Sequence, residues 1–268
     1  MIYSVKNQVF LLCALLTAFS CVSVNTSGPK PEKTQFSPWY YTFNILLVPE
    51  ELKDSLRLEL AMTLLQVNYP PERAKFLNEL LYSADNIDTY KDMVIDEQRE
   101  KSRSNISVGQ GRVDWRYTEN VSVKNFGNDG IVIERDFGNY PGGAHSLETK
   151  RYYVIDLDKL RMLKIDDMFG DFQGDKVREI VYAELRKFSN LEEDRPLSDG
   201  IFFKDEPELS FNFFFTQEGL GLHWDPYEIA PYSEGGIEVI LPWKSIRPFM
   251  LHSGMELLTK FGIYLFVG

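Results

Sequence analysis

Three histidines, at positions 145, 223 and 252, are the side chains of this sequence best suited to proton transfer or metal binding. His145 could act as a general base if an acid such as Glu228 or Asp225 oriented its imidazole ring. His223, Asp225 and His145 could together supply three ligands to a zinc ion. No His-x-x-x-His or paired-cysteine spacing accompanies them, so we expect no metal site, no cofactor and no catalytic residue. We interpret His145 as a residue that packs at the start of a strand.

Neighbouring acids offer a second route to chemistry, because glycan hydrolysis uses two carboxyl groups at a defined separation. Asp166-Asp167 and Glu192-Glu193-Asp194 are the candidates. Acids that are adjacent in sequence point in different directions on a helix, so we interpret both groups as helix caps or solvated faces. Ser146 directly follows His145, but no third member of a catalytic triad and no Gly-x-Ser-x-Gly motif accompanies it.

Two loops hold unusual combinations of residues. The segment 137–145 contains a proline, two adjacent glycines and His145 between two segments that alternate like strands. Glycine adopts backbone angles closed to other residues, and proline fixes its own, so this composition indicates a tight bend or a partner close to the backbone. The segment 225–232 carries two Pro-Tyr steps around a short apolar centre. If the fold brings the two loops together, they form a site.

The first 21 residues are typical of a secretion signal. Lys6 precedes an apolar run, residues 9–20, that is too short to span a bilayer. Small residues three and one positions before Cys21 resemble a bacterial lipoprotein signal, in which cleavage leaves the cysteine as the lipidated first residue. An ordinary signal peptidase site, with Cys21 incidental, is the alternative. We expect an envelope lipoprotein, anchored to a membrane and facing the periplasm or the exterior, with residues 22–38 as a flexible tether.

Acidic residues outnumber basic ones. The chain has 29 Lys and Arg against 40 Asp and Glu, a net charge of −11, and removal of the signal takes away Lys6 and no acid. Such a charge repels nucleic acids and anionic lipid surfaces and steers cationic molecules toward the chain. We therefore expect no nucleic-acid partner and keep a cationic protein as a candidate partner. Solubility of an envelope protein is the simpler explanation of the charge.

Alternation of apolar residues predicts two strands at residues 41–47 and 56–64, joined by a turn at 49–54. Pro71 then opens a helix with a buried apolar stripe, and a more polar helix follows at residues 88–103. These elements form a small α+β unit.

A second series of strands follows, with an Asp-Gly turn that is typical of a hairpin. Asp175 is expected to cap a helix whose apolar residues share one face. The strands are predicted at residues 113–124, 131–137, 146–157, 209–216, 220–224 and 236–241. The predicted fold class is α+β: an antiparallel sheet meander with helices packed on one face over residues 114–268, preceded by the smaller α+β unit over residues 39–113.

Several sequence blocks, in this order, resemble a known domain. They are Tyr140-Pro141-Gly142-Gly143-Ala144-His145, Tyr152-Tyr153-Val154-Ile155-Asp156-Leu157 and Lys164-Ile165-Asp166-Asp167-Met168-Phe169. Together with the stretch 213–241, they resemble the C-terminal extracellular domain of the RsiV-like family. The resemblance covers residues 114–250, and the preceding segment is similar, more loosely, to a small α+β unit that often precedes that domain. The family includes lysozyme-sensing anti-sigma factors, some peptidoglycan deacetylases that carry the domain as an accessory, and many uncharacterised lipoproteins.

The resemblance implies binding rather than catalysis. The family members understood best bind animal-type lysozyme, a cationic enzyme, by inserting loops of this domain into its cleft. The matching positions of this sequence are Tyr140, Gly142, Gly143, Ala144, His145, Ser146, Pro226, Tyr227, Pro231 and Tyr232. The sequence lacks the cytoplasmic and transmembrane segments of the anti-sigma pattern and the catalytic domain of the deacetylase pattern. We therefore expect neither direct control of a sigma factor nor an inherited deacetylase activity.

The sequence thus leads to the hypothesis of an envelope-anchored, non-catalytic binding module that uses two adjacent loops. Its ligand would be a protein or a glycan: lysozyme, another cationic envelope protein, or peptidoglycan. One alternative is a cell-wall-active hydrolase with a site near His145. Another is a purely structural envelope lipoprotein.

Overall fold

The computed structural model describes residues 38–47, 56–67, 70–84, 86–106, 113–142 and 145–265. The predicted signal, the lipidation site at Cys21, nearly all of the predicted tether, the turn at 49–54, and Gly143 and Ala144 lie outside the described residues. No helix in the described part of the chain is long and apolar enough to cross a membrane.

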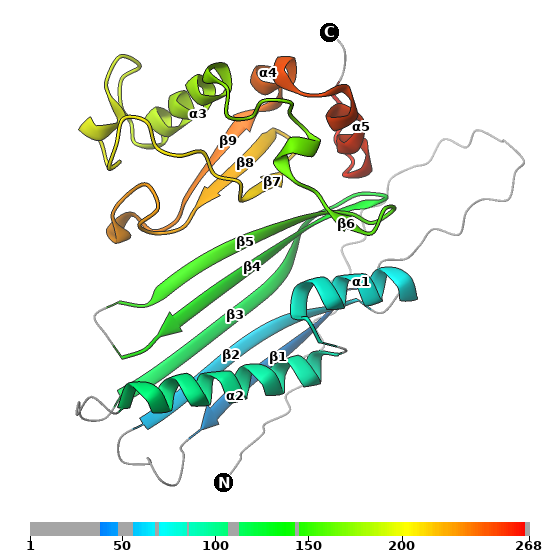
Figure 1. The fold of residues 1–268 in the computed structure, drawn as a ribbon, viewed down its shortest axis with the longest axis vertical. Helices are drawn as coiled ribbons and strands as arrows, with labels where there is room; N and C mark the ends of the chain where they lie inside the picture. The colour runs from blue at the N-terminus through cyan, green and yellow to red at the C-terminus, as the bar shows by residue number, and fades with distance from the viewer. Residues whose placement is uncertain are drawn as a thin grey trace, which may run out of the picture.

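A twisted six-stranded sheet forms the centre of the molecule (Figure 1). Its strands follow one another in chain order, and every neighbouring pair is antiparallel except β2 and β3, which are parallel. The strands are β1 (Pro38–Leu47), β2 (Leu56–Val67), β3 (Val113–Phe126), β4 (Gly130–Tyr140), β5 (Leu147–Asp156) and β6 (Arg161–Met162). Strands β1 and β2, from the predicted smaller unit, and strands β3 to β6 belong to this one sheet, and the boundary near residue 113 stays a prediction.

Two helices cover one face of this sheet, namely α1 (Pro71–Tyr82) and α2 (Ile87–Ile106). They carry the chain from β2 to β3, which explains the parallel pairing, since parallel neighbours need a long crossover connection. Pro71 occupies the first turn of α1, where its missing N–H group leaves no bond unmade. The apolar side of β2, Leu58 to Leu64, packs against these helices in one buried cluster.

A second layer, formed by the C-terminal part of the chain, covers β4 and β5 on the opposite face (Figure 1). Alternation along β4 explains how one strand serves two cores: Ile131 and Ile133 belong to the cluster under α1 and α2, whereas Val132 belongs to the C-terminal cluster. The main elements of this layer are α3 (Asp175–Phe188), β7 (Phe213–Phe215), β8 (Gly219–Trp224), β9 (Ile237–Pro242), α4 (Trp243–Ile246) and α5 (His252–Lys260).

The second layer is also held by short 3-10 helices and by ion pairs. Lys260 of α5 contacts Asp156 at the end of β5 at 2.8 Å, which ties the last helix to the long sheet. The 3-10 helices are η1 (Ile165–Asp167), η2 (Leu197–Asp199), η3 (Tyr232–Glu234) and η4 (Arg247–Phe249).

The α+β class and most predicted elements are confirmed, but two local predictions are wrong. The strand expected at residues 209–216 is reduced to β7, because side chains occupy the backbone partners before it: the Ser210 hydroxyl donates to the His223 carbonyl, and the Asn212 amide donates to the Lys150 carbonyl at 2.7 Å. Asp175 does not cap α3. Gly174 is the capping residue, and Asp175 is the first residue of the helix.

Candidate functional site

The structure brings the two unusual loops into contact. The hydroxyls of Ser146 and Tyr232 lie 3.1 Å apart, and the ring of His145 lies 5.0 Å from the ring of Tyr232. On its other side, Tyr232 lies 5.6 Å from the ring of Tyr227. We call these four residues the tyrosine cluster. Segments about 80 positions apart in sequence therefore share one surface.

The second loop is folded so that its two halves point in opposite directions. Ile229 and Ala230 are buried in the C-terminal core, whereas Tyr227 is 60% exposed. The Tyr227 N–H donates to the Ala230 carbonyl at 3.2 Å, and the Asp225 N–H donates to the Glu228 carboxylate at 2.7 Å. These bonds close a tight turn in which Tyr227 has a φ of 72°, a left-handed conformation that costs a bulky residue free energy.

The structure places four other predicted binding residues near this cluster, without side-chain contacts that tie them to it. Tyr140 is the last residue of β4, opposite Arg116, and Gly142 has a φ of 82° in the loop that follows. Pro231 precedes the 3-10 helix that carries Tyr232. Pro226 is half-buried and lines a groove beside the cluster.

That groove has a volume of about 530 Å³. It lies between the face of β3, β4 and β5 that is turned away from α1 and α2, here called the outer face, and the segments around the end of β8 and the start of β9. Four carboxylates, one lysine and one histidine line it, together with two threonines and two phenylalanines. These residues are Asp136, Glu148, Asp225, Glu238, Lys150, His223, Thr118, Thr149, Phe137 and Phe188.

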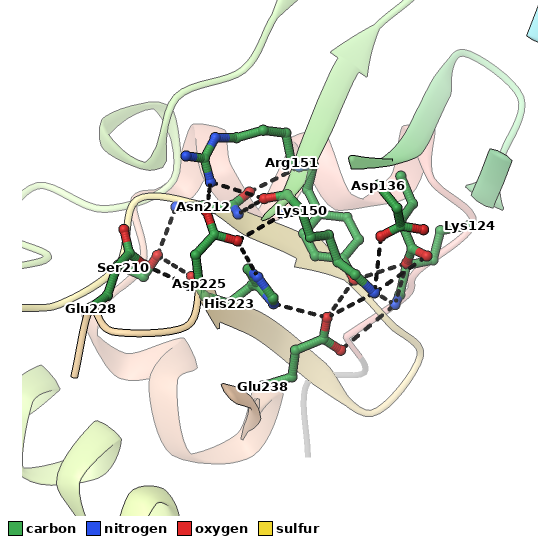
Figure 2. A network of polar contacts seen from close by, with 12 residues as sticks. Lys124, Asp136, Lys150, Arg151, Ser210, Asn212, His223, Asp225, Glu228 and Glu238 are labelled. Carbon is green, nitrogen blue, oxygen red and sulfur yellow. Dashed lines mark hydrogen bonds and ion pairs between the residues drawn. The ribbon is translucent and has the colours of Figure 1, made fainter. Parts of the chain in front are cut away.

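Asp225 connects the second loop to the long sheet. Its carboxylate accepts the backbone N–H of Lys150 at 2.8 Å, the guanidinium of Arg151 at 2.6 Å and the imidazole of His223 at 2.9 Å (Figure 2). Burial works against ionisation, but these bonds hold the pKa of Asp225 below its usual range. Asp225 thus fixes the root of the turn that presents Tyr227.

His223 lies between two carboxylates and is only 4% exposed. Its Nε2 contacts Asp225 at 2.9 Å, and its Nδ1 contacts Glu238 at 3.2 Å. A neutral imidazole has one N–H group, whereas the protonated ring can donate to both acids. Burial alone would lower the pKa of His223, but the bonds to Asp225 and Glu238 raise it above its ordinary value. The arrangement therefore favours a charged imidazolium.

Glu238 joins His223 to the outer face of the long sheet. It accepts the Tyr152 hydroxyl at 2.6 Å and lies 3.5 Å from the Lys150 ammonium. Burial opposes the charge of Glu238, but the bonds from His223 and Tyr152 and the nearby lysines lower its pKa to about 2. Lys150 is shared, since it also lies 3.4 Å from Glu134 and 3.5 Å from Asp136.

Part of this site lies in a segment that is similar to a known protein family. Residues 166–244 match the family model described as protein of unknown function, DUF3298. The segment 166–244 is therefore similar to a DUF3298 domain. The matched segment contains His223, Asp225, Tyr227, Tyr232 and Glu238, so it supplies one wall of the groove and one half of the tyrosine cluster.

Solved structures of the family share the fold. A DUF3298 family member from Bacteroides fragilis superposes with a TM-score of 0.67 at 17% identity, over 85% of this chain and 98% of that chain. A DUF3298 family protein from Pseudomonas aeruginosa superposes with a TM-score of 0.56 at 15% identity, over 82% of this chain and 97% of that chain. Agreement at such low identity concerns the fold alone.

One curated relative has a named activity. The peptidoglycan-N-acetylmuramic acid deacetylase PdaC of Bacillus subtilis is 29% identical over 170 residues, which is 61% of this chain. The chain spans about a third of the length of that relative, 34%. The finer resemblance to the RsiV-like family stays a prediction.

The structure gives structural partners to the acids that the sequence analysis considered for chemistry. Asp225 and Glu228, the acids considered as partners of His145, have other partners: Asp225 binds His223, and Glu228 accepts the Asp225 N–H. In the described part of the chain, His145 contacts the Tyr232 ring and makes no ion pair with a carboxylate. Asp167 pairs with Arg161 at 2.8 Å and accepts the Lys164 N–H, which is a structural cap. Within the described residues, no group of three His, Cys, Asp or Glu side chains could hold a metal ion.

The sequence did not predict Lys150 and Glu238, two further residues that line the groove. Glu238 carried a weak signal, because it alternates with the inward apolar residues Ile237 and Val239 and so must face away from them. Lys150 carried none, since nothing local to β5 marks its partners in β4 and β9.

Proposed function

We propose that this chain is a non-catalytic binding module of the cell envelope that recognises a cationic protein through the tyrosine cluster. The observation that carries the proposal is the contact between the two loops, in which Ser146 and His145 hold Tyr232 and Tyr232 packs on Tyr227. Loops supported by a rigid sheet are the usual place for recognition surfaces.

The exposure and the backbone of Tyr227 support a role in recognition. An aromatic ring that is 60% exposed gains little for the fold, yet the turn holds it in a left-handed conformation. Such strain persists only where the surrounding structure enforces it, and it is concentrated at functional sites. Tyrosine is also common among the residues that dominate binding energy, because it offers a large contact area with few rotatable bonds.

Charge indicates the class of partner. Glu148, Glu228 and Glu234 are exposed around the tyrosine cluster, and the chain as a whole has a net charge of −11. Complementary charge steers association and suppresses anionic partners. Animal lysozyme is cationic and is the partner that the RsiV-like resemblance implies, so it is the probe of choice.

Calorimetry with the purified full chain and lysozyme tests the proposal. We expect Tyr227→Ala to weaken binding about 30-fold, a loss of about 2 kcal/mol typical of a hot-spot residue. Tyr264→Ala is the matched control, because Tyr264 is 58% exposed and lies outside the cluster, and it should change affinity less than twofold. Absence of binding, or equal losses in the two variants, would overturn the proposal.

A cell-wall-active enzyme is the second candidate, and the named activity of the Bacillus subtilis relative is the observation in its favour. Incubation of peptidoglycan with the wild type and with His145→Ala distinguishes the binding module from the enzyme. We expect identical, unchanged muropeptide profiles from both proteins. Released acetate or new fragments with the wild type alone would establish the enzyme instead.

The envelope location rests on the N-terminal sequence and has its own test. Mass spectrometry of the mature N-terminus in native membranes should show a lipid-modified Cys21. An unmodified terminus at another residue would leave the binding module without the proposed anchor.

A further inference from the structure

We propose that the groove beside the tyrosine cluster is a second, separate binding site, and that it takes a short oligosaccharide. The groove lies over the outer face of β3, β4 and β5 and is closed on one side by the ends of β8 and β9. The proposed protein-binding surface does not require it.

The dimensions of the groove suit a small ligand. Its volume of about 530 Å³ falls within the range of about 300–1,000 Å³ that small-molecule sites occupy. Gly138 keeps the floor low: a Cβ atom at this position would meet the Thr118 hydroxyl at 2.3 Å, so a side chain cannot be accommodated without displacing Thr118. The Thr118 hydroxyl therefore lies directly against the backbone of β4 and forms part of the groove floor.

The lining alternates hydrogen-bond donors and acceptors. Lys150 donates, Asp136 and Glu148 accept, and the hydroxyl of Thr118 does both. A phosphate or carboxylate ligand would face the two acids unpaired. A sugar hydroxyl donates and accepts at one atom, so a chain of hydroxyls satisfies such a mixed surface.

Asp136 is a half-buried lining acid whose ion pair is long and shared. Asp225 and Glu238 each receive several short hydrogen bonds, whereas the nearest cation to Asp136 is Lys150 at 3.5 Å, which it shares with Glu134 and Glu238. Burial and the nearby Glu134 raise the pKa of Asp136 even though Lys150 opposes this. Asn120 donates one hydrogen bond to Asp136, and ligand hydroxyls would supply further ones.

An apolar rim completes the site. Phe188, the last residue of α3, is 44% exposed and borders the groove beside Pro226. A pyranose ring has one face of C–H groups, and packing this face on an aromatic ring removes apolar surface from water. Hydroxyls at the ring edge then remain available to the polar floor.

The strand pairing disfavours a peptide in the same groove. An extended peptide commonly binds by adding a strand to an open sheet edge. Strands β3 and β4 each pair with a neighbouring strand on both sides. On the free side of β5, the backbone N–H of Lys150 already donates to the Asp225 carboxylate. The floor therefore offers side chains rather than unpaired backbone.

His223 provides a local readout, because it lines the groove and titrates. We expect chitotetraose or cellotetraose, added to the full chain, to shift the imidazole resonances of His223 in NMR spectra and to bind measurably in calorimetry. A tetrapeptide of similar length should do neither. No shift and no heat with both saccharides, or a shift with the peptide alone, would overturn the proposal.

Substitutions then locate the ligand. Thr118→Trp should fill the groove and weaken saccharide binding at least tenfold, whereas Thr42→Trp, at an exposed threonine of the same sheet face outside the groove, should leave it unchanged. Asp136→Asn should weaken binding about fivefold. Equal affinities in Thr118→Trp and the wild type would refute the site. Tyr227→Ala should retain saccharide binding, so a failure of the proposed protein recognition and a failure of this groove can be told apart.

Discussion

Two charged networks lie on opposite faces of the same sheet, and they differ in how completely they are enclosed. The first joins Glu119 of β3 to Arg135 of β4 at 2.8 Å under helices α1 and α2. Tyr117 and Tyr90 donate to the same carboxylate at 2.8 and 3.0 Å, and Arg135 also donates to the Leu81 carbonyl at the end of α1. Every charge has a short, fixed partner.

The second network, around His223, faces the groove. Lys150 divides its charge among Glu134, Asp136 and Glu238 at 3.4–3.5 Å, distances longer than those of the enclosed network. A closed network stabilises the fold because all its bonds are made internally. An open one leaves donors and acceptors for a ligand, so the same residue types act as structure on one face and as a candidate site on the other.

The largest effect should come from opening the enclosed network. Glu119→Ala leaves Arg135 buried without its counter-charge, so we expect the free energy of unfolding to fall by about 3–5 kcal/mol in a denaturant titration. Glu59→Ala, which removes the exposed ion pairs to Arg57 and Arg116, is the control and should cost at most about 1 kcal/mol. Similar losses in the two variants would erase the distinction between closed and open networks.

A smaller effect is expected where the open network anchors the binding loop. Asp225→Asn keeps the size of the side chain but removes the charge that holds His223 and Arg151, so stability should fall by about 1–3 kcal/mol. The same variant should weaken lysozyme binding, because the turn that presents Tyr227 begins at Asp225. A variant that loses stability and keeps full affinity would show that the root of the loop has no part in recognition.

The pH dependence of stability should separate the two networks further. The folded pKa of His223 is raised, so its stabilising contribution is complete below its ordinary value of about 6.5 and is lost as pH rises through the folded value. The lowered pKa values of Asp225 and Glu238 work in the opposite sense, so stability is lost again as acid protonates them. In chemical denaturation, His223→Gln should remove the decline above pH 6.5, while Glu119→Gln should keep it.

The smallest effect concerns backbone strain. Tyr227→Gly relieves a left-handed conformation, so stability should stay within about 1 kcal/mol of the wild type or rise by that amount. Lysozyme binding should fall as in Tyr227→Ala. A loss of stability much larger than this in thermal unfolding would mean that the Tyr227 ring supports the fold rather than a ligand.

The sequence predicts the elements better than it predicts their partners. Alternation in β1 to β5 and the Asp-Gly turn follow from local physics. The special residues of the two loops marked each loop as unusual, but only the fold shows that the loops meet. The position of His223 between Asp225 and Glu238 was not predictable in the same way. Asp225 binds the backbone of Lys150, 75 positions away, and that pairing depends on how the C-terminal layer sits on β5.

The parallel pairing of β2 with β3 and the groove are missing from the sequence prediction for a related reason. Both arise from the relative placement of whole elements, with α1 and α2 on one face of the six-stranded sheet and a three-stranded sheet of β7, β8 and β9 on the other. A residue such as Glu238 shows only that it faces away from a core, and the fold decides what it faces toward.

Hydrogen–deuterium exchange of the full chain with and without lysozyme tests whether the tyrosine cluster is the recognition surface. We expect slower exchange on binding at His145, Ser146 and residues 226–234, with no change in α2 or β1. Bound lysozyme that leaves these loops unprotected, or protects other surfaces instead, would contradict recognition through the tyrosine cluster.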